Sequence, residues 1–275
     1  MTPRVLAIAA RAAALTPPQL DRPLAAAVGR VWCATDALRR DAVRGNRAAL
    51  SAGFPLHAPF VHYIAAAFGW LRLLHARPDR VRAHSRVEGL APLLAARDEG
   101  VGTVLVAAHV GEWEWGAAAL AARGLSVVAV AGTQMRPAWS PALAAAERAL
   151  GIEVVGPGHS PARLVRALRR GAVVALLVDG DVATARRGAA LLGARADLPL
   201  GPARLAARAG ARLVGGRCER RAGTYHVRLS ALDAALPAGD EDARFEAVRA
   251  WLGATLAEDP GRWCLFRPFF ERAGA

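Results

Sequence analysis

Apolar residues recur at helical spacing through the first third of the chain, with Phe60, Ile64, Phe68 and Leu71 on one predicted helical face. Such a stripe is more typical of a buried core than of a lipid-facing surface. We therefore predict a helical N-terminal region over residues 1–83.

After residue 84 the pattern changes to short apolar, partly β-branched runs that alternate with amphipathic segments and are separated by glycines. Such runs are typical of buried parallel strands. The strands are expected at residues 101–108, 125–131, 152–155, 172–178, 212–216 and 225–229. The helices are expected at 87–99, 112–123, 140–150, 161–170, 202–209 and 244–258. Alternating strands and helices predict an α/β fold with a largely parallel central sheet flanked by helices. We expect residues 84–275 and the helical N-terminal extension to form one integrated domain.

The first residues combine a short apolar stretch with an interrupting charge at Arg11 and end at Pro17 and Pro18. A signal peptide needs an unbroken apolar stretch, so this segment is a poor one. An amphipathic helix that lies on the protein core or on a membrane surface fits better. No apolar run approaches the ~20 residues of a spanning helix. A second helix is expected from Leu24 to Arg40.

The charge balance adds a partner class to this picture. The 275 residues carry 36 basic and 23 acidic side chains, a net charge of +13, and every basic residue is arginine. A GC-rich coding bias is an alternative reason for arginine over lysine, but it does not account for the sign of the charge. The excess predicts an anionic partner, such as nucleic acid, an anionic lipid surface or an acidic protein. No nucleic-acid-binding module is recognisable, so we expect no nucleic-acid partner.

The cysteines and the overall composition exclude several other classes. With 54% hydrophobic residues the chain cannot be a disordered protein. Three widely separated cysteines, Cys33, Cys218 and Cys264, predict neither a disulfide framework nor a cysteine-rich zinc site. A reducing cytoplasmic environment is the default expectation.

The segment from His109 to Glu114 is the strongest candidate for chemistry. His109 follows a predicted buried strand, at the sheet edge where open α/β folds place their active sites. Glu114 lies about one helical turn further on, from which a carboxylate can reach back to the imidazole. A carboxylate there fixes the tautomer, and the other ring nitrogen can then accept a proton from a hydroxyl. The alternative is a histidine at a strand-to-helix turn, with Glu112 and Glu114 favouring the start of the helix.

A second candidate follows another predicted strand, at Asp179-Gly180-Asp181. Two acids there indicate a metal site or acceptors for a polar substrate, although aspartate and glycine are also ordinary turn residues. Arg186 and Arg187 come shortly afterwards and could clamp a phosphate or belong to a solvated loop.

The His109–Glu114 hexapeptide is similar to the H-x-x-x-x-(D/E) motif of glycerolipid-type acyltransferases. A wider stretch resembles the bacterial lipid A biosynthesis lauroyl/myristoyl acyltransferase family, which includes phosphatidylinositol mannoside acyltransferases. The similarity runs in family order through residues 44–55, 87–115, 168–181, 191–214 and 262–270. The family usually has asparagine where Glu112 stands, so two carboxylates here compete to orient His109.

The resemblance implies transfer of a fatty acyl group from acyl-CoA or acyl carrier protein to a hydroxyl of a membrane glycolipid or phospholipid. His109 would be the general base and Glu114 would orient it, while the turn at Gly111 would present backbone donors to the oxyanion. Arg136, Asp179, Asp181 and Arg187 would bind the acceptor or shape its site. No metal and no cofactor beyond the thioester co-substrate is expected.

The resemblance also implies a location at the cytoplasmic face of the inner membrane, where the protein would be peripheral or N-terminally anchored. An anionic membrane surface and an acidic carrier protein would both suit the +13 charge. Two alternatives remain open. One is a thioester or ester hydrolase that uses His109 to activate water, and the other is a non-catalytic lipid- or nucleic-acid-binding homologue.

Overall fold

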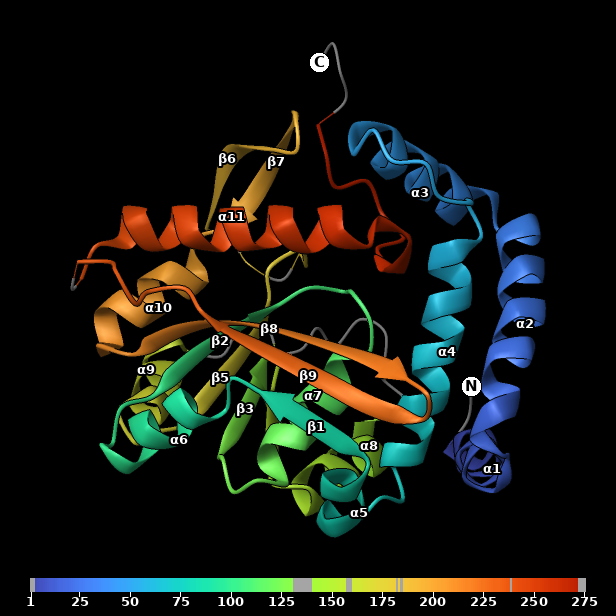
Figure 1. The fold of residues 1–275 in the computed structure, drawn as a ribbon, viewed down its shortest axis with the longest axis horizontal. Helices are drawn as coiled ribbons and strands as arrows, with labels where there is room; N and C mark the ends of the chain where they lie inside the picture. The colour runs from blue at the N-terminus through green and yellow to red at the C-terminus, as the bar shows by residue number, and fades with distance from the viewer. Residues whose placement is uncertain are drawn as a thin grey trace.

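A computed structural model describes residues 3–130, 140–156, 160–181, 183, 185–237 and 239–271. Its main feature is a seven-stranded sheet in the order β1-β9-β8-β2-β5-β3-β4 (Figure 1). The strands are β1 (Ser85–Glu88), β2 (Thr103–Ala107), β3 (Val127–Val130), β4 (Ile152–Val155), β5 (Val173–Leu177), β8 (Arg212–Arg221) and β9 (Thr224–Ala231). Neighbouring strands are parallel except for the antiparallel pair of β8 and β9. The predicted α/β class with a largely parallel sheet is confirmed.

Helices cover both faces of this sheet, because its central strands present apolar side chains in both directions. On β2, Val104 and Val106 belong to one buried cluster, whereas Leu105 belongs to another. The first cluster packs under α9 (Pro161–Leu168), α10 (Gly201–Ala209) and α11 (Glu241–Glu258). The second packs against helices that include α5 (Pro78–Ala83), α6 (Ala91–Asp98) and α7 (Trp113–Ala121). On this side α8 (Ser140–Ala149) follows β3.

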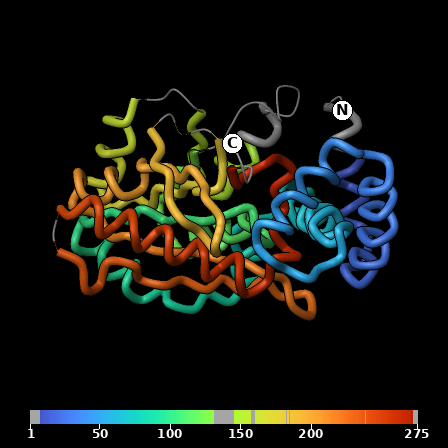
Figure 2. The backbone as a smooth tube through the Cα atoms, turned by 90° about the horizontal axis from the view of Figure 1, so that it is seen from above, coloured from blue at the N-terminus to red at the C-terminus, as the bar shows by residue number. Residues whose placement is uncertain are grey.

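The N-terminal helices gather at one end of the molecule, as the blue segment of Figure 2 shows. They are α1 (Pro3–Leu15), α2 (Asp21–Thr35), α3 (Ala37–Ala49) and α4 (Ala58–Leu73). Asp21, which is 2% exposed, receives two hydrogen bonds from Arg72 of α4, at 2.6 and 2.7 Å. Asp21 also pairs with Arg220 of β8, so this carboxylate ties the N-terminal helices directly to the sheet.

Two local predictions were wrong, and one element was missed. The helix expected over 24–40 is interrupted at Asp36, whose side chain accepts a hydrogen bond from the backbone N–H of Arg39 and starts α3. The helix expected over 87–99 is preceded by the edge strand β1. Residues 186–199 form a hairpin of β6 (Arg186–Leu191) and β7 (Ala194–Pro199), which packs near α11 and which the sequence analysis did not predict.

Candidate active site

The central strands β2 and β5 bring the two strongest sequence candidates together. These strands pair in register so that Ala107 lies opposite Leu177. His109 and Asp179 each stand two residues beyond that pair, at the carboxyl edge of a parallel sheet. The backbone N–H of Val178 donates to the carbonyl of Ala107 at 2.9 Å and extends the pairing up to the turn. Local strand register therefore places the imidazole next to the carboxylate.

Asp179 makes two hydrogen bonds with His109. Its Oδ1 lies 2.9 Å from His109 Nδ1, and its Oδ2 accepts the backbone N–H of His109, also at 2.9 Å. A carboxylate can only accept, so Nδ1 carries the proton and Nε2 is the ring nitrogen with a lone pair. Asp179 is fully buried, whereas 26% of the His109 side chain is exposed.

The electrostatics of this pair favour its charged form. Burial by itself would lower the pKa of His109, but the charge and hydrogen bond of Asp179, with a further contribution from Glu114, outweigh it and raise that pKa above its usual value. Burial would likewise raise the pKa of Asp179, but His109 and the indole of Trp263 hold it below its usual range. The imidazole is therefore a stronger base than a free histidine.

This arrangement differs from the sequence analysis in one respect. The carboxylate at Nδ1 is Asp179, whereas the sequence analysis gave the orienting role to Glu114. Asp179 is fully buried, and its two carboxylate oxygens accept hydrogen bonds from His109 and Trp263. Its expected part in binding the acceptor or shaping the site stays a prediction.

Glu114 lies on the first turn of α7 and lines a cavity together with Val110 and Trp113. The Trp113 ring meets the His109 ring edge to face, with centroids 5.1 Å apart. The cavity has a volume of about 130 Å³, and most of its lining is apolar. It runs between the sheet and its helices, along side chains that include Leu105, Ala129, Leu150, Ile152, Ala175 and Leu229. Such a lining suits an apolar ligand.

Gly111 makes the turn between β2 and α7 possible. Its φ of +72° is in the left-handed region, and a Cβ there would lie 2.1 Å from the carbonyl oxygen of Cys218. Only glycine fits at this close approach. The next N–H, that of Glu112, already donates to the Cys218 carbonyl at 2.9 Å. That N–H is therefore already bonded within the protein, whereas the N–H groups of the first turn of a helix have no partner inside the helix.

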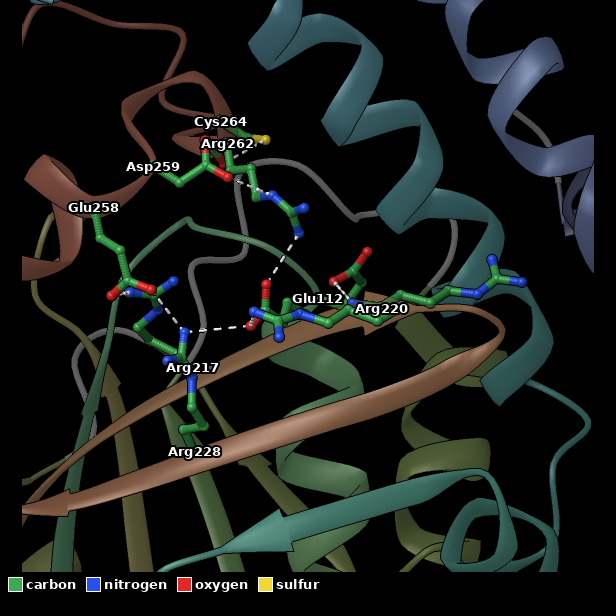
Figure 3. Close-up of polar contacts among 10 residues, drawn as sticks. Glu112, Arg217, Arg220, Arg228, Glu258, Asp259, Arg262 and Cys264 are labelled. Carbon is green, nitrogen blue, oxygen red and sulfur yellow. Dashed lines mark hydrogen bonds and ion pairs between the residues drawn. The ribbon is translucent and has the colours of Figure 1, made fainter.

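Glu112 occupies an arginine-rich surrounding next to this turn (Figure 3). Its Oε2 accepts the backbone N–H of Arg220 at 3.1 Å. Burial raises its pKa to about 7, even though Arg262 and Arg220 act in the opposite direction. Glu112 therefore keeps its proton to a higher pH than a free glutamate does, unlike Asp179.

The arginines that the sequence analysis considered for substrate binding differ in their contacts. Arg187 pairs with Asp242 at 2.8 Å and lies over the Phe245 ring, so it is engaged with α11. Its neighbour Arg186 instead donates to the carbonyl of Gly180 at 2.9 Å, beside the His109 ring. Asp181 is exposed at the same turn. Arg136 lies outside the described residues.

The C-terminal strap, residues 263–270, supplies partners that the sequence analysis did not assign. Trp263 Nε1 donates to Asp179 Oδ2 at 2.7 Å, and Arg267 donates to the carbonyl of Asp179 at 2.6 Å. The backbone N–H of Cys264 donates to the His109 carbonyl at 2.7 Å. Trp263 and Arg267 lie in the segment 262–270 that resembles the family, and this resemblance was the signal that could have pointed to them. Nothing in the sequence linked them to Asp179.

The cysteines close to the site offer no nucleophile. Burial raises the pKa of Cys218 and of Cys264 well above the usual thiol value, so both stay protonated at neutral pH. Neither thiol therefore competes with the His109–Asp179 pair as the candidate reactive group at this sheet edge.

Comparison with known proteins identifies the family of this chain. The sequence profile of the bacterial lipid A biosynthesis acyltransferase family matches residues 5–272. The chain belongs to this family. A phosphatidylinositol mannoside acyltransferase of Mycobacterium tuberculosis (strain CDC 1551 / Oshkosh) is 29% identical over 203 residues, which cover 72% of this chain and 62% of that protein. The aligned region thus spans less than two thirds of the relative's length.

Proposed function

We propose that this protein is an O-acyltransferase that moves a fatty acyl group from an acyl thioester to a hydroxyl of a membrane glycolipid or phospholipid. The observation that carries the proposal is the His109–Asp179 pair, whose chain neighbours Val110, Trp113 and Glu114 line an apolar cavity. The family and the mycobacterial relative support the same reaction class.

In the proposed reaction, each residue of the pair has one step. His109 Nε2 removes the proton of the acceptor hydroxyl while its oxygen attacks the thioester carbonyl. Asp179 keeps Nδ1 protonated and stabilises the imidazolium that forms. A new C–O bond replaces the C–S bond, and the imidazolium returns the proton to the departing sulfur. General-base catalysis of this kind contributes about 10²–10⁴-fold.

The cavity would receive the acyl chain, since most of its lining is apolar and the lining includes Val110, Trp113 and Glu114, close in sequence to His109. Arg186 and Arg267 donate to successive carbonyls, those of Gly180 and Asp179, and bring two positive charges to the edge of the site. These arginines, in place of Arg187, would attract a phosphate of the donor or the acceptor. Acyl-CoA and acyl carrier protein both carry such a phosphate.

The N-terminal helices would rest on an anionic membrane surface. Exposed apolar side chains gather there, at Ile8, Leu15, Leu20, Leu24, Val28, Val31 and Leu38. Arginines on the same helices suit anionic lipid headgroups. Among the described residues, no helix is long and apolar enough to cross a bilayer. We place the protein at the cytoplasmic face of the inner membrane.

The test is lipid analysis of a strain that lacks this protein, complemented with the wild type or with His109→Gln. The expected result is a lipid with one missing acyl chain, restored by the wild type and not by the variant. Full restoration by His109→Gln would refute the catalytic role. Purified protein that releases free fatty acid from acyl-CoA at the same rate with and without lipid vesicles would instead indicate the hydrolase alternative.

A further inference from the structure

Asn46 is a buried polar residue in the N-terminal region, 4% exposed on α3. Its side chain reaches the backbone of the C-terminal strap, more than two hundred residues away in sequence. Nδ2 donates to the carbonyl of Arg267 at 2.9 Å and lies 3.5 Å from that of Leu265. Oδ1 accepts the backbone N–H of Phe269 at 3.0 Å.

These partners are alternate residues of the strap, Leu265, Arg267 and Phe269. A slip of the strap by one residue would move these three backbone groups away from Asn46 and break its hydrogen bonds. The apolar side chains of the strap set its depth, since Trp263, Leu265, Phe269 and Phe270 are buried in the core. The paired donor and acceptor of the Asn46 amide add a directional constraint that specifies the same register.

The register of the strap matters because the strap holds the reactive pair. Trp263 donates to the Asp179 carboxylate and Arg267 donates to its carbonyl. Cys264 fixes the backbone of His109 from the other side. A shifted strap would withdraw all three contacts together.

We propose that Asn46 is a positioning residue for the reaction centre: it fixes the register of the C-terminal strap and thereby holds Asp179 against His109. The catalytic part of this inference rests on the proposed function. The N-terminal helices are then part of the catalytic machinery as well as a membrane-facing surface.

The test compares Asn46→Leu, which keeps a similar shape without donor or acceptor, with Ser85→Ala in full-length protein. Ser85 is a matched control, because it is also buried and its Oγ donates to the carbonyl of Val81 at 2.6 Å, away from the strap. Three quantities are measured: melting temperature, kcat and KM with acyl-CoA and lipid vesicles, and the His109 titration by NMR, assigned with His109→Gln.

For Asn46→Leu we expect kcat to fall about 10²-fold with little change in KM. The pKa of His109 should fall toward its usual value, because the Asp179 contact loosens. Ser85→Ala should lower the melting temperature by an amount similar to that of Asn46→Leu. It should keep the kcat and the His109 titration of the wild type.

A wild-type kcat and His109 titration in Asn46→Leu would overturn the proposal, and so would equal changes in Ser85→Ala. If Asn46→Leu does not fold, Asn46→Ser is measured in the same way and judged by the same results. The NMR titration needs no substrate. If the wild type transfers no acyl group while the Asn46 variants still lower the pKa of His109, the proposed function fails and the positioning role stands.

Discussion

Two carboxyl groups beside the same sheet edge have pKa values that are shifted in opposite directions. Asp179, in the turn after β5, is fully buried and its pKa is lowered. Glu112, in the turn after β2, is less buried by accessible surface, yet its pKa is raised to about 7. Burial alone would have raised the pKa of both groups.

The difference lies in the donors that each carboxyl receives. Asp179 accepts from the ring and backbone of His109 and from the indole of Trp263, and it faces a group that can become a cation. Glu112 accepts one backbone N–H, that of Arg220. At this sheet edge, the charge of His109 together with the directed hydrogen bonds keeps Asp179 ionised. That ionised group is the one suited to support a base.

The largest expected effect is that of Asp179→Asn. The amide keeps the size of the side chain but removes the negative charge and permits the wrong imidazole tautomer. We expect kcat to fall about 10³-fold, and the pKa of His109 to drop below its wild-type value. Steady-state kinetics and the NMR titration check both expectations. A loss of less than tenfold would show that the pair is structural.

Trp263→Phe should have a smaller effect, because it removes one hydrogen-bond donor to Asp179 while an aromatic ring still packs at this position. A hydrogen bond to a charged group contributes roughly 1.5–3 kcal/mol. We expect kcat to fall at least about tenfold. The pKa of Asp179 should rise, which is the direction in which the pKa of Glu112 is shifted. Leu265→Met, a volume-conserving change in the same strap, is the control and should keep near wild-type kinetics. Equal losses in both variants would point to general packing.

Much of the fold was predictable because its signals are local. Apolar runs and glycines gave the strands over 103–107, 152–155 and 173–177 to within two residues. The hairpin of β6 and β7 was missed because its residues, from Arg186 to Pro199, are mostly small, polar or charged and lack an alternating apolar pattern. The position of His109 at a strand end also followed from local pattern.

The roles around His109 were less predictable, because they depend on strand order. Glu114 was favoured for its closeness in sequence, whereas Asp179 becomes a neighbour only because β5 pairs with β2. The contacts from Trp263 and Asn46 span 84 and 223 residues of sequence, and no periodicity reports such contacts.

Glu114→Gln tests how much the other carboxylate near His109, which lines the cavity, contributes beside Asp179. Glu114 raises the pKa of His109 through its charge, by less than Asp179 does. A base acts in its neutral form, so activity should rise with pH through the pKa of His109. Removing the Glu114 charge should shift this rising limb to lower pH and cost less than about tenfold in kcat. A loss as large as that of Asp179→Asn would restore Glu114 as the principal partner.

The smallest expected effect concerns stability rather than rate. The pKa of Glu112 is raised from 4.5 to about 7 on folding, so the folded state holds this proton more tightly than the unfolded state. Stability is therefore lost as pH rises from about 4.5 to about 7. The full shift corresponds to about 3 kcal/mol, and solvent at the accessible edge reduces it to on the order of 1–2 kcal/mol.

Glu112→Gln keeps an acceptor for the Arg220 N–H but cannot ionise. Urea unfolding at pH 5 and pH 8 should show that the wild type loses on the order of 1–2 kcal/mol more than the variant between these two pH values. His109 does not confound the comparison, since both proteins carry it. If the wild type and Glu112→Gln lose the same stability, the Glu112 carboxyl is ionised in the folded protein, and the contrast with Asp179 disappears.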